Sequence, residues 1–177
     1  MKKGIVVYKS KYGASKWYAE KIAEKCDLDY KDLNKIKISD IKDYDTIIFC
    51  GGVYASGISY RKFLNKNYKK LNGKKIILFF NGASPADETT LKNIVKNNFK
   101  FDLTNITIFY GRGRWYLDKM SFLDRTLCKM LIKMTSKKED NALQPWEQAL
   151  MEARDKDCDW TSEEYIEPLI DYVLKIN

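Results

Sequence analysis

Five short runs with strand character, four of them strongly apolar, constrain this chain most. They lie at residues 4–8, 30–33, 46–50, 75–80 and 106–110. Segments with helical periodicity separate them, at residues 16–26, 60–71 and 87–99. A strand, a helix and a further strand form the βαβ unit of a parallel sheet. Because such crossovers are right-handed, we expect helices on both faces of the sheet.

The absence of a sixth strand in the sequence pattern favours one arrangement of these units. Doubly wound sheets have either six strands or five in the order 2-1-3-4-5. The sequence therefore predicts a three-layer α/β sandwich with a five-stranded parallel sheet in that order. Ligands of such sheets bind at the carboxyl ends of the strands, where the strand order reverses. Here that point lies between the first and third strands.

Three loops rich in small residues follow strands at this edge, at residues 10–15, 51–57 and 81–84. The first precedes a helix, whose N-terminal N–H groups attract anions and let a phosphate approach closely. Gly13 can take the positive φ that such a loop requires, and Ser10 and Ser15 add hydroxyl donors. Tyr54 offers a flat ring for stacking on a ligand. Taken alone, each loop also fits ordinary turn chemistry.

The alternation of strands and helices ends at Gly111, and a basic helical insertion follows at about residues 112–138. Within it, residues 120–135 predict an amphipathic helix. Its apolar face comprises Met120, Leu123, Leu127, Met130 and Met134, with Leu131 beside them, whereas Arg125, Lys129 and Lys133 lie opposite. We find no linker in the sequence, and we predict one domain spanning residues 1–177.

Two further helices are expected in the C-terminal part. The first covers residues 144–154, in an acidic segment at about residues 139–157. Residues 161–164, Thr-Ser-Glu-Glu, fit a capping box that opens the last helix. Pro168 predicts that this helix is kinked or begins later.

The net charge of +8 is distributed unevenly along the chain. Residues 112–138 carry eight basic and two acidic side chains, whereas residues 139–177 carry three basic and eleven acidic ones. The basic helix at residues 119–135 has three interpretations: packing within the domain or in a homo-oligomer, contact with an anionic membrane surface, or nucleic-acid binding. We expect no nucleic acid. The acidic C-terminal region is expected to neutralise the basic segment.

The chain has no histidine, and its four cysteines are scattered. Histidine bases and triads are therefore excluded, and we predict no metal site, because a cysteine-only zinc site needs tighter spacing. We expect single thiols in or near the core. No apolar run approaches the roughly 20 residues of a membrane-spanning helix. Since no signal peptide is recognisable either, we expect a cytoplasmic protein, with peripheral membrane contact left open.

The loop Ser-Lys-Tyr-Gly-Ala-Ser at residues 10–15 resembles the phosphate loop of flavodoxins, Thr/Ser-x-Thr-Gly-x-Thr. The resemblance implies a flavodoxin-like fold and flavin mononucleotide (FMN) as the cofactor, with electron transfer as the function. Two later loops look like those that border the flavin ring. The implied FMN-binding residues are Ser10, Lys11, Tyr12, Gly13, Ala14, Ser15, Gly52, Val53, Tyr54, Ala55, Ser56, Gly57, Asn81, Gly82 and Ala83. Tyr12 stands where the flavodoxin loop has a threonine.

A narrower resemblance involves residues 111–116, 123–125 and 130–134 and the Asp-Trp pair at 159–160. These are similar to the insertion and C-terminal motif of the quinone-dependent protoporphyrinogen oxidase family. The resemblance implies an FMN-dependent oxidoreductase that passes electrons from a porphyrinogen-like substrate to a quinone. It places Arg112, Arg114, Trp115 and Tyr116 at the substrate entrance. The acidic segment at about residues 139–157 departs from the family pattern.

Two other functions fit the same sequence. The chain could be a flavodoxin-like electron carrier that turns over no small molecule, although such carriers are usually acidic and this chain is basic. It could also be a non-redox binding domain that has lost FMN, because a fold alone does not fix a function. Turnover with a quinone distinguishes the oxidoreductase from the electron carrier. Flavin absorbance of the purified protein distinguishes both of them from the domain that has lost FMN.

Overall fold

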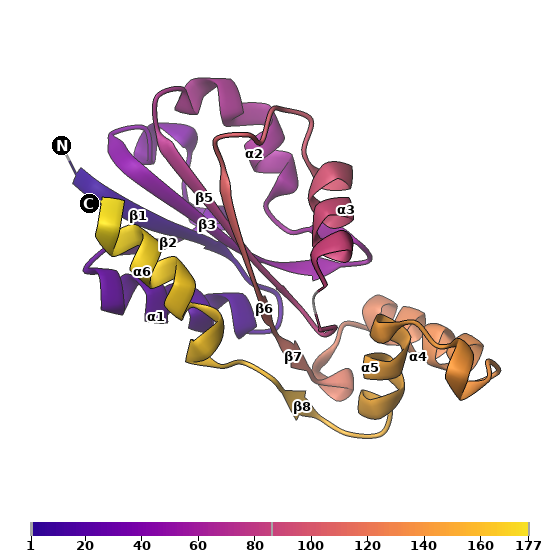
Figure 1. The fold of residues 1–177 in the computed structure, drawn as a ribbon. Helices are drawn as coiled ribbons and strands as arrows, with labels where there is room; N and C mark the ends of the chain where they lie inside the picture. Colours follow the sequence, from indigo (N-terminus) through magenta and orange to yellow (C-terminus); the bar gives the residue numbers. More distant parts are fainter. Residues whose placement is uncertain (1, 86, 177) are drawn as a thin grey trace.

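The computed structural model describes residues 2–85 and 87–176, which are built around a parallel sheet (Figure 1). The strand order β2-β1-β3-β5-β6 confirms the predicted flavodoxin-like arrangement, and all four pairings along it are parallel. A short strand, β4 (Gly57–Ile58), pairs antiparallel with β3. The five parallel strands are β1 (Lys2–Lys9), β2 (Asp29–Asp32), β3 (Tyr44–Tyr54), β5 (Lys75–Gly82) and β6 (Thr107–Arg112).

Helices cover both faces of the sheet. Helices α1 (Ala14–Cys26) and α6 (Glu167–Ile176) lie on one face, and α2 (Arg61–Asn67) and α3 (Glu88–Asn98) on the other (Figure 1). Alternate strand residues point to opposite faces, as the period of a strand requires. Ile47 and Phe49 therefore join the core under α2 and α3, and Ile48 joins the core under α1 and α6.

Some element boundaries differ from the sequence prediction. Strand β3 does not end at Cys50, as predicted, but continues to Tyr54, because its end pairs with β4 in a hairpin. Helix α2 is shorter than predicted and is followed by a 3-10 turn. The 3-10 turns lie at Leu33–Lys35, Ile38–Asp40, Tyr68–Leu71, Leu117–Lys119, Asp140–Ala142 and Glu163–Tyr165.

The predicted capping box at residues 161–164 is wrong. The Thr161 hydroxyl donates to Asp159 instead of capping a helix, and the Ser162 hydroxyl caps only the 3-10 turn that follows. Helix α6 begins later, at Glu167, and Pro168 is its second residue. A proline is tolerated there because the first helical N–H groups have no partner within the helix.

The chain between β6 and α6 leaves the sheet and returns to it. Strands β7 (Arg114–Trp115) and β8 (Cys158–Asp159) pair antiparallel at its base. Between them lie α4 (Phe122–Thr135) and α5 (Pro145–Ala153), which confirm the two helices predicted there. We call residues 117–153 the arm. It extends beyond the carboxyl ends of the strands, and its helices do not cover the sheet (Figure 1).

The cysteines agree with the sequence prediction. All four are free thiols; Cys26, Cys50 and Cys158 are buried and Cys128 is half-buried. Among residues 2–85 and 87–176, no cluster of acidic and cysteine side chains has the composition of a metal site. No helix within those residues has the length and apolar character needed to cross a bilayer.

Candidate functional site

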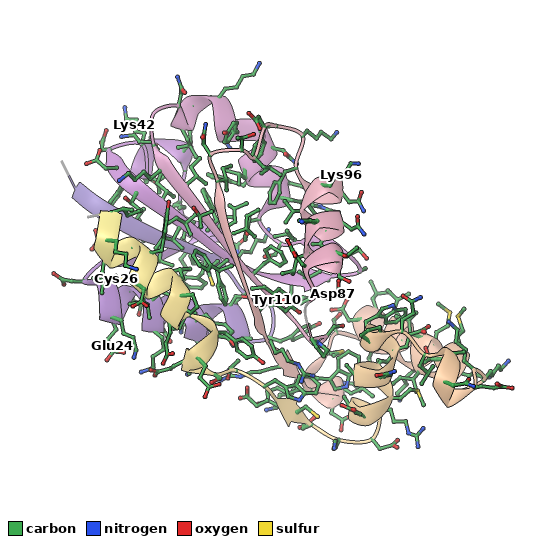
Figure 2. The ribbon with its side chains drawn as sticks, in the orientation of Figure 1. Glu24, Cys26, Lys42, Asp87, Lys96 and Tyr110 are labelled. Carbon is green, nitrogen blue, oxygen red and sulfur yellow. The ribbon has the colours of Figure 1, made fainter. Side chains whose placement is uncertain are left out.

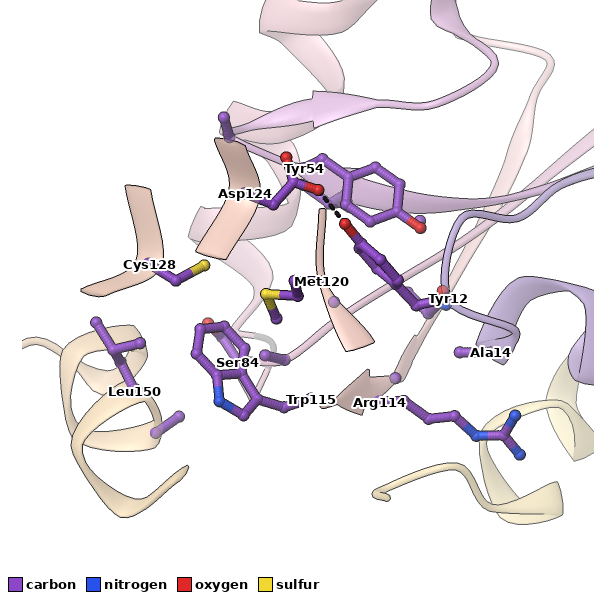
Figure 3. Close-up of a pocket in the computed structure, with 18 of the residues that line it drawn as sticks. Tyr12, Ala14, Tyr54, Ser84, Arg114, Trp115, Met120, Asp124, Cys128 and Leu150 are labelled. Carbon is purple, nitrogen blue, oxygen red and sulfur yellow. Dashed lines mark hydrogen bonds between the residues drawn. The ribbon is translucent and has the colours of Figure 1, made fainter. Parts of the chain in front are cut away.

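A cavity of about 260 Å³ lies between the carboxyl ends of the strands and the arm (Figure 3). One wall comes from the loops after the strands and the other from the arm, so the cavity joins the sheet edge to the two added helices. The first wall comprises Tyr12, Ala14, Gly52, Val53, Tyr54, Ala55, Asn81, Gly82, Ala83, Ser84, Gly113 and Arg114. The second comprises Met120, Asp124, Leu127, Cys128, Leu131, Trp146, Ala149 and Leu150 of the arm, together with Trp115 of β7.

The loop before α1 presents free N–H groups at this edge. Gly13 has φ of 90° and precedes the helix, and its own N–H donates to the Ser10 hydroxyl at 3.1 Å. In the described chain no side chain caps α1, and the first helical hydrogen bond runs from the Trp17 N–H to the Gly13 carbonyl. The N–H groups of the first turn are therefore available to an anion.

Arg114 brings a positive charge to the same loop. A Cβ atom built on Gly13 would lie 3.1 Å from Nη1 of Arg114. On its other side, Nε of Arg114 pairs with Asp159 at 2.8 Å, and the Tyr116 hydroxyl donates to the same carboxylate at 3.2 Å. Burial raises the pKa of Asp159, but hydrogen bonds from Thr161 and the pair with Arg114 hold it below its usual value. The guanidinium is thus fixed beside the loop.

Ser15 points away from the loop and into the protein. Its hydroxyl donates to Oδ1 of Asn81 at 3.0 Å, and both side chains are buried. This bond joins the start of α1 to the end of β5. In this structure Ser15 therefore fixes the position of the helix N-terminus against the sheet edge.

The loop after β3 is a tight hairpin. Ala55 and Ser56 both have positive φ, at 46° and 63°, as a type I′ turn requires. Neither is glycine, so the turn is strained at the wall of the cavity. Buried Asn98 supports it from below: its amide donates to the Ser56 carbonyl at 2.8 Å, and its Oδ1 accepts from the Ile58 N–H at 2.7 Å.

The loop after β5 is held through three successive carbonyl groups. The Gly82 carbonyl accepts from the Gly113 N–H at 2.8 Å. The carbonyls of the next two residues accept from Arg112 Nε, at 3.0 Å, and from the Tyr110 hydroxyl, at 2.7 Å. Arg112 also lies over the Trp160 ring, 4.1 Å from its centre. A Cβ atom on Gly82 would lie 2.9 Å from the Tyr110 hydroxyl oxygen, so a glycine leaves room for that hydroxyl.

Two buried polar atoms near the cavity lack a hydrogen-bond partner within the described chain: Nη2 of Arg112 and Nε1 of Trp115. Only Trp115 lines the cavity, and its side chain is 9% exposed. A buried donor without an acceptor costs free energy. Both atoms are enclosed by the surrounding protein, so neither is open to a ligand in the cavity.

Lys11 and Tyr12 connect the first loop to the arm. The Tyr12 hydroxyl donates to Asp124 of α4 (Figure 3), and the Lys11 ammonium donates to the same carboxylate. These bonds hold the pKa of Asp124 below its usual value, and the bond to Asp124 raises the pKa of Lys11. The Tyr12 ring meets Tyr54 edge to face at 5.9 Å. Tyr12, Tyr54 and Asp124 line one side of the cavity, and Lys11 supports them from outside it.

A sequence comparison assigns the family. The model of the flavodoxin domain matches residues 5–142. The chain belongs to the flavodoxin domain family. The match covers the sheet and α4, and it ends before α5. No curated protein sequence matches the chain.

Solved structures similar to this flavodoxin domain include flavodoxins and a related protein. An archaeal flavodoxin is 19% identical, with 72% of this chain and 92% of that chain covered and a TM-score of 0.43. The two-electron reduced flavodoxin of Megasphaera elsdenii is 18% identical, with 60% and 82% covered and a TM-score of 0.47. The Trp repressor binding protein of Bacillus subtilis is 16% identical, with 63% and 85% covered and a TM-score of 0.46. At these identities the likeness concerns the fold.

The structure brings most of the predicted FMN-binding residues to the cavity. Those that line it are Tyr12, Ala14, Gly52, Val53, Tyr54, Ala55, Asn81, Gly82 and Ala83. The others, which belong to the same loops without lining it, are Ser10, Lys11, Gly13, Ser15, Ser56 and Gly57. Of the predicted substrate residues, Arg114 and Trp115 line the cavity, whereas Arg112 and Tyr116 bond to neighbouring backbone and side-chain groups outside it.

Three features of the site were missed in the sequence. Asp124 was noted only as part of the insertion motif, although it is the sole acidic residue of α4. Asn98 ends α3, far along the chain from the hairpin that it supports. Helix α5 was predicted, but nothing in its sequence showed that it forms a wall of the cavity. The one usable signal in the sequence concerned Asp124, because a single carboxylate on an otherwise basic helix indicates a specific contact.

Proposed function

We propose that this flavodoxin domain binds FMN in the cavity and acts as an FMN-dependent oxidoreductase. The observation that carries the proposal is the meeting of an anion-binding helix N-terminus, the Arg114 guanidinium and a cavity lined by Tyr12 and Tyr54. This combination suits a ligand with a phosphate at one end and a flat aromatic ring at the other. Membership of the flavodoxin family supports the choice of FMN as that ligand.

The phosphate end fits the loop at residues 10–15. Free N–H groups of α1 and the positive φ of Gly13 form a concave donor surface. Arg114 adds a charge, and a guanidinium suits phosphate oxygens because it can donate two parallel hydrogen bonds. We assign Arg114 to this role in place of the substrate entrance.

The ring end fits the rest of the cavity. Tyr12 and Tyr54 supply aromatic surfaces, and the Tyr54 hydroxyl accepts from the Lys11 N–H at 3.3 Å. Burial raises the pKa of Tyr54, so its hydroxyl stays neutral. The backbone of residues 81–83 borders the same space.

Bound FMN would supply the redox chemistry, which side chains of this composition lack. The chain's own residues do the rest. The hydrogen bonds to the Gly82, Ala83 and Ser84 carbonyls fix the loop beside the ring, and Asn98 fixes the strained hairpin. Lys11, Tyr12 and Asp124 hold the arm over the cavity, which limits the access of water.

The apolar wall of the arm supports a finer proposal for the substrates. In it, a porphyrinogen-like compound loses two electrons and two protons, and a quinone takes them up to become a quinol. Apolar side chains such as Met120, Leu127 and Leu150 suit a flat, weakly polar molecule. An electron carrier that turns over no small molecule would have no use for this wall.

The absorbance spectrum of the purified protein, with and without added FMN, tests the proposal. We expect flavin bands that stay with the protein after gel filtration. Reduction of a soluble quinone by the flavin-loaded protein then separates an oxidoreductase from a carrier. A colourless protein that ignores excess FMN would instead indicate a domain that has lost its cofactor.

A further inference from the structure

Helix α4 carries a large exposed apolar surface. Nine large apolar side chains are exposed on the described chain, and seven of them belong to the arm. Six lie on α4, namely Phe122, Leu123, Leu127, Met130, Leu131 and Met134, and Trp146 lies on α5. Phe122 is 82% exposed and Leu123 is 72% exposed. Soluble proteins usually scatter such side chains singly, and a cluster marks a contact surface.

The exposed side chains form a stripe opposite the packed side of the helix. Leu123, Leu127, Met130 and Met134 follow the three- and four-residue spacing that keeps one face in line. Cys128 and Ile132 lie on the inner side and pack into the core of the arm. The packing within the arm therefore uses the inner side of α4, and the stripe has no partner in the described chain.

A row of lysines borders the stripe. Lys129, Lys133 and Lys137 are exposed and four residues apart, and none has an acidic partner among residues 2–85 and 87–176. Arg125 is different, because its guanidinium donates to the carbonyls of Leu117 and Met120 at 3.1 and 3.3 Å. The three ammonium groups thus face solvent beside an apolar stripe.

We propose that α4 lies on an anionic lipid surface, with its stripe at the acyl boundary and its lysines among the headgroups. This is the arrangement of an interfacial amphipathic helix, which binds through apolar area and through attraction to anionic lipids. No described helix could span a bilayer, so the contact is peripheral.

Charge favours lipid over a second copy of the chain. A second copy packed symmetrically on the stripe would bring two lysine rows together, and like charges repel, whereas an anionic lipid surface attracts lysines. Leu127 and Leu131 line the cavity and are also exposed. The lipid surface would therefore lie at the mouth of the cavity.

Co-sedimentation with vesicles tests the proposal, with and without FMN. We expect binding to vesicles of phosphatidylcholine containing roughly a quarter phosphatidylglycerol, and little binding to phosphatidylcholine alone. The double variant Leu123→Ser, Met130→Ser should lower the ratio of bound to free protein about tenfold or more, because it removes buried apolar area. Lys129→Glu with Lys133→Glu should lower it about tenfold or more as well.

Matched controls lie elsewhere on the surface. Leu174→Ser changes an equally exposed leucine on α6, which is 59% exposed. Lys62→Glu with Lys96→Glu makes the same change of charge on α2 and α3, where Figure 2 labels Lys96. Both controls should bind like the unchanged protein.

Three results would overturn the proposal: no binding to anionic vesicles, binding that the arm variants do not change, or equal binding to neutral vesicles. Analytical ultracentrifugation covers the main rival. A dimer that dissociates in the Leu123→Ser, Met130→Ser variant, without lipid binding, would assign the stripe to a second copy. Because lipid binding does not require FMN, this test can fail while the flavin proposal stands.

Discussion

Helices α4 and α6 have the same kind of apolar pattern but opposite surroundings. On α6, Leu169 and Val173 are fully buried against α1 and the sheet. On α4, Leu123 and Met134 are 72% and 60% exposed. A periodic apolar face shows that a helix has an apolar surface that a neighbour can bury. It does not show whether the chain itself, a partner or a lipid surface covers it.

The position of each helix in the chain explains the difference. Helix α6 follows a segment that returns to the sheet, so its apolar face completes a layer already half built by α1. Helix α4 lies beyond the end of the sheet and packs on α5 with its inner side only. The same residue types thus stabilise the fold in α6 and stay available for contact in α4.

The largest expected effect tests this comparison directly. Leu169→Ala should lower the free energy of unfolding by about 2–5 kcal/mol, because it leaves a cavity in the core. Leu123→Ala should change it by less than about 0.5 kcal/mol, because the side chain is already in water. Urea denaturation of the two variants measures both values. Similar losses would mean that α4 is packed against something in solution.

A second comparison concerns two glycines with positive φ. Gly13 has φ of 90° in the candidate phosphate loop, and Gly73 has φ of 78° with open space around it. Alanine at either position should cost about 1–3 kcal/mol of stability through backbone strain. Only Gly13→Ala should also weaken FMN binding, as a fluorescence titration measures. Equal FMN affinity in both variants would mean that the loop at residues 10–15 does not bind the phosphate.

The contact between the arm and the first loop should depend on pH. Asp124→Asn should lower the free energy of unfolding by about 1 kcal/mol near neutral pH, since it removes the acceptor for Lys11 and Tyr12. The folded pKa of Asp124 lies below its unfolded value of about 3.9. The difference should persist above that value and vanish as the pH falls through the folded pKa. Denaturation of both proteins from neutral to acid conditions measures it, and a constant difference would contradict this assignment.

The smallest effect concerns the thiol in the cavity. Cys128 lines the cavity and is half-buried, whereas the other three cysteines are buried. Burial and the nearby Asp124 raise its pKa, so alkylation should be slow but faster than at the other thiols. FMN bound in the cavity should slow the alkylation of Cys128 further, roughly severalfold. Mass spectrometry after timed alkylation, with and without FMN, checks this order; a buried cysteine reacting first would refute it.

The parallel sheet was predictable because four of its five strands are continuous apolar runs and because the loops after three of them contain small residues. The first loop was found in the same way, since a glycine between a strand and a helix has a local meaning. The hairpin at Ala55 and Ser56 was not predictable, because neither residue favours positive φ. Asn98 and Asp124 act through contacts distant in sequence. Such contacts leave no mark in local periodicity.

The central claim is that the loop at residues 10–15 and Arg114 bind the phosphate of FMN. The most direct test titrates the protein and its Arg114→Ala variant with FMN and with riboflavin, which lacks the phosphate. Arg154→Ala serves as the control, because that arginine pairs with Asp155 at the same 2.8 Å as Arg114 with Asp159. We predict that Arg114→Ala weakens FMN binding about tenfold or more and leaves riboflavin binding nearly unchanged. Equal losses for both ligands, or no preference for FMN in the unchanged protein, would contradict the account.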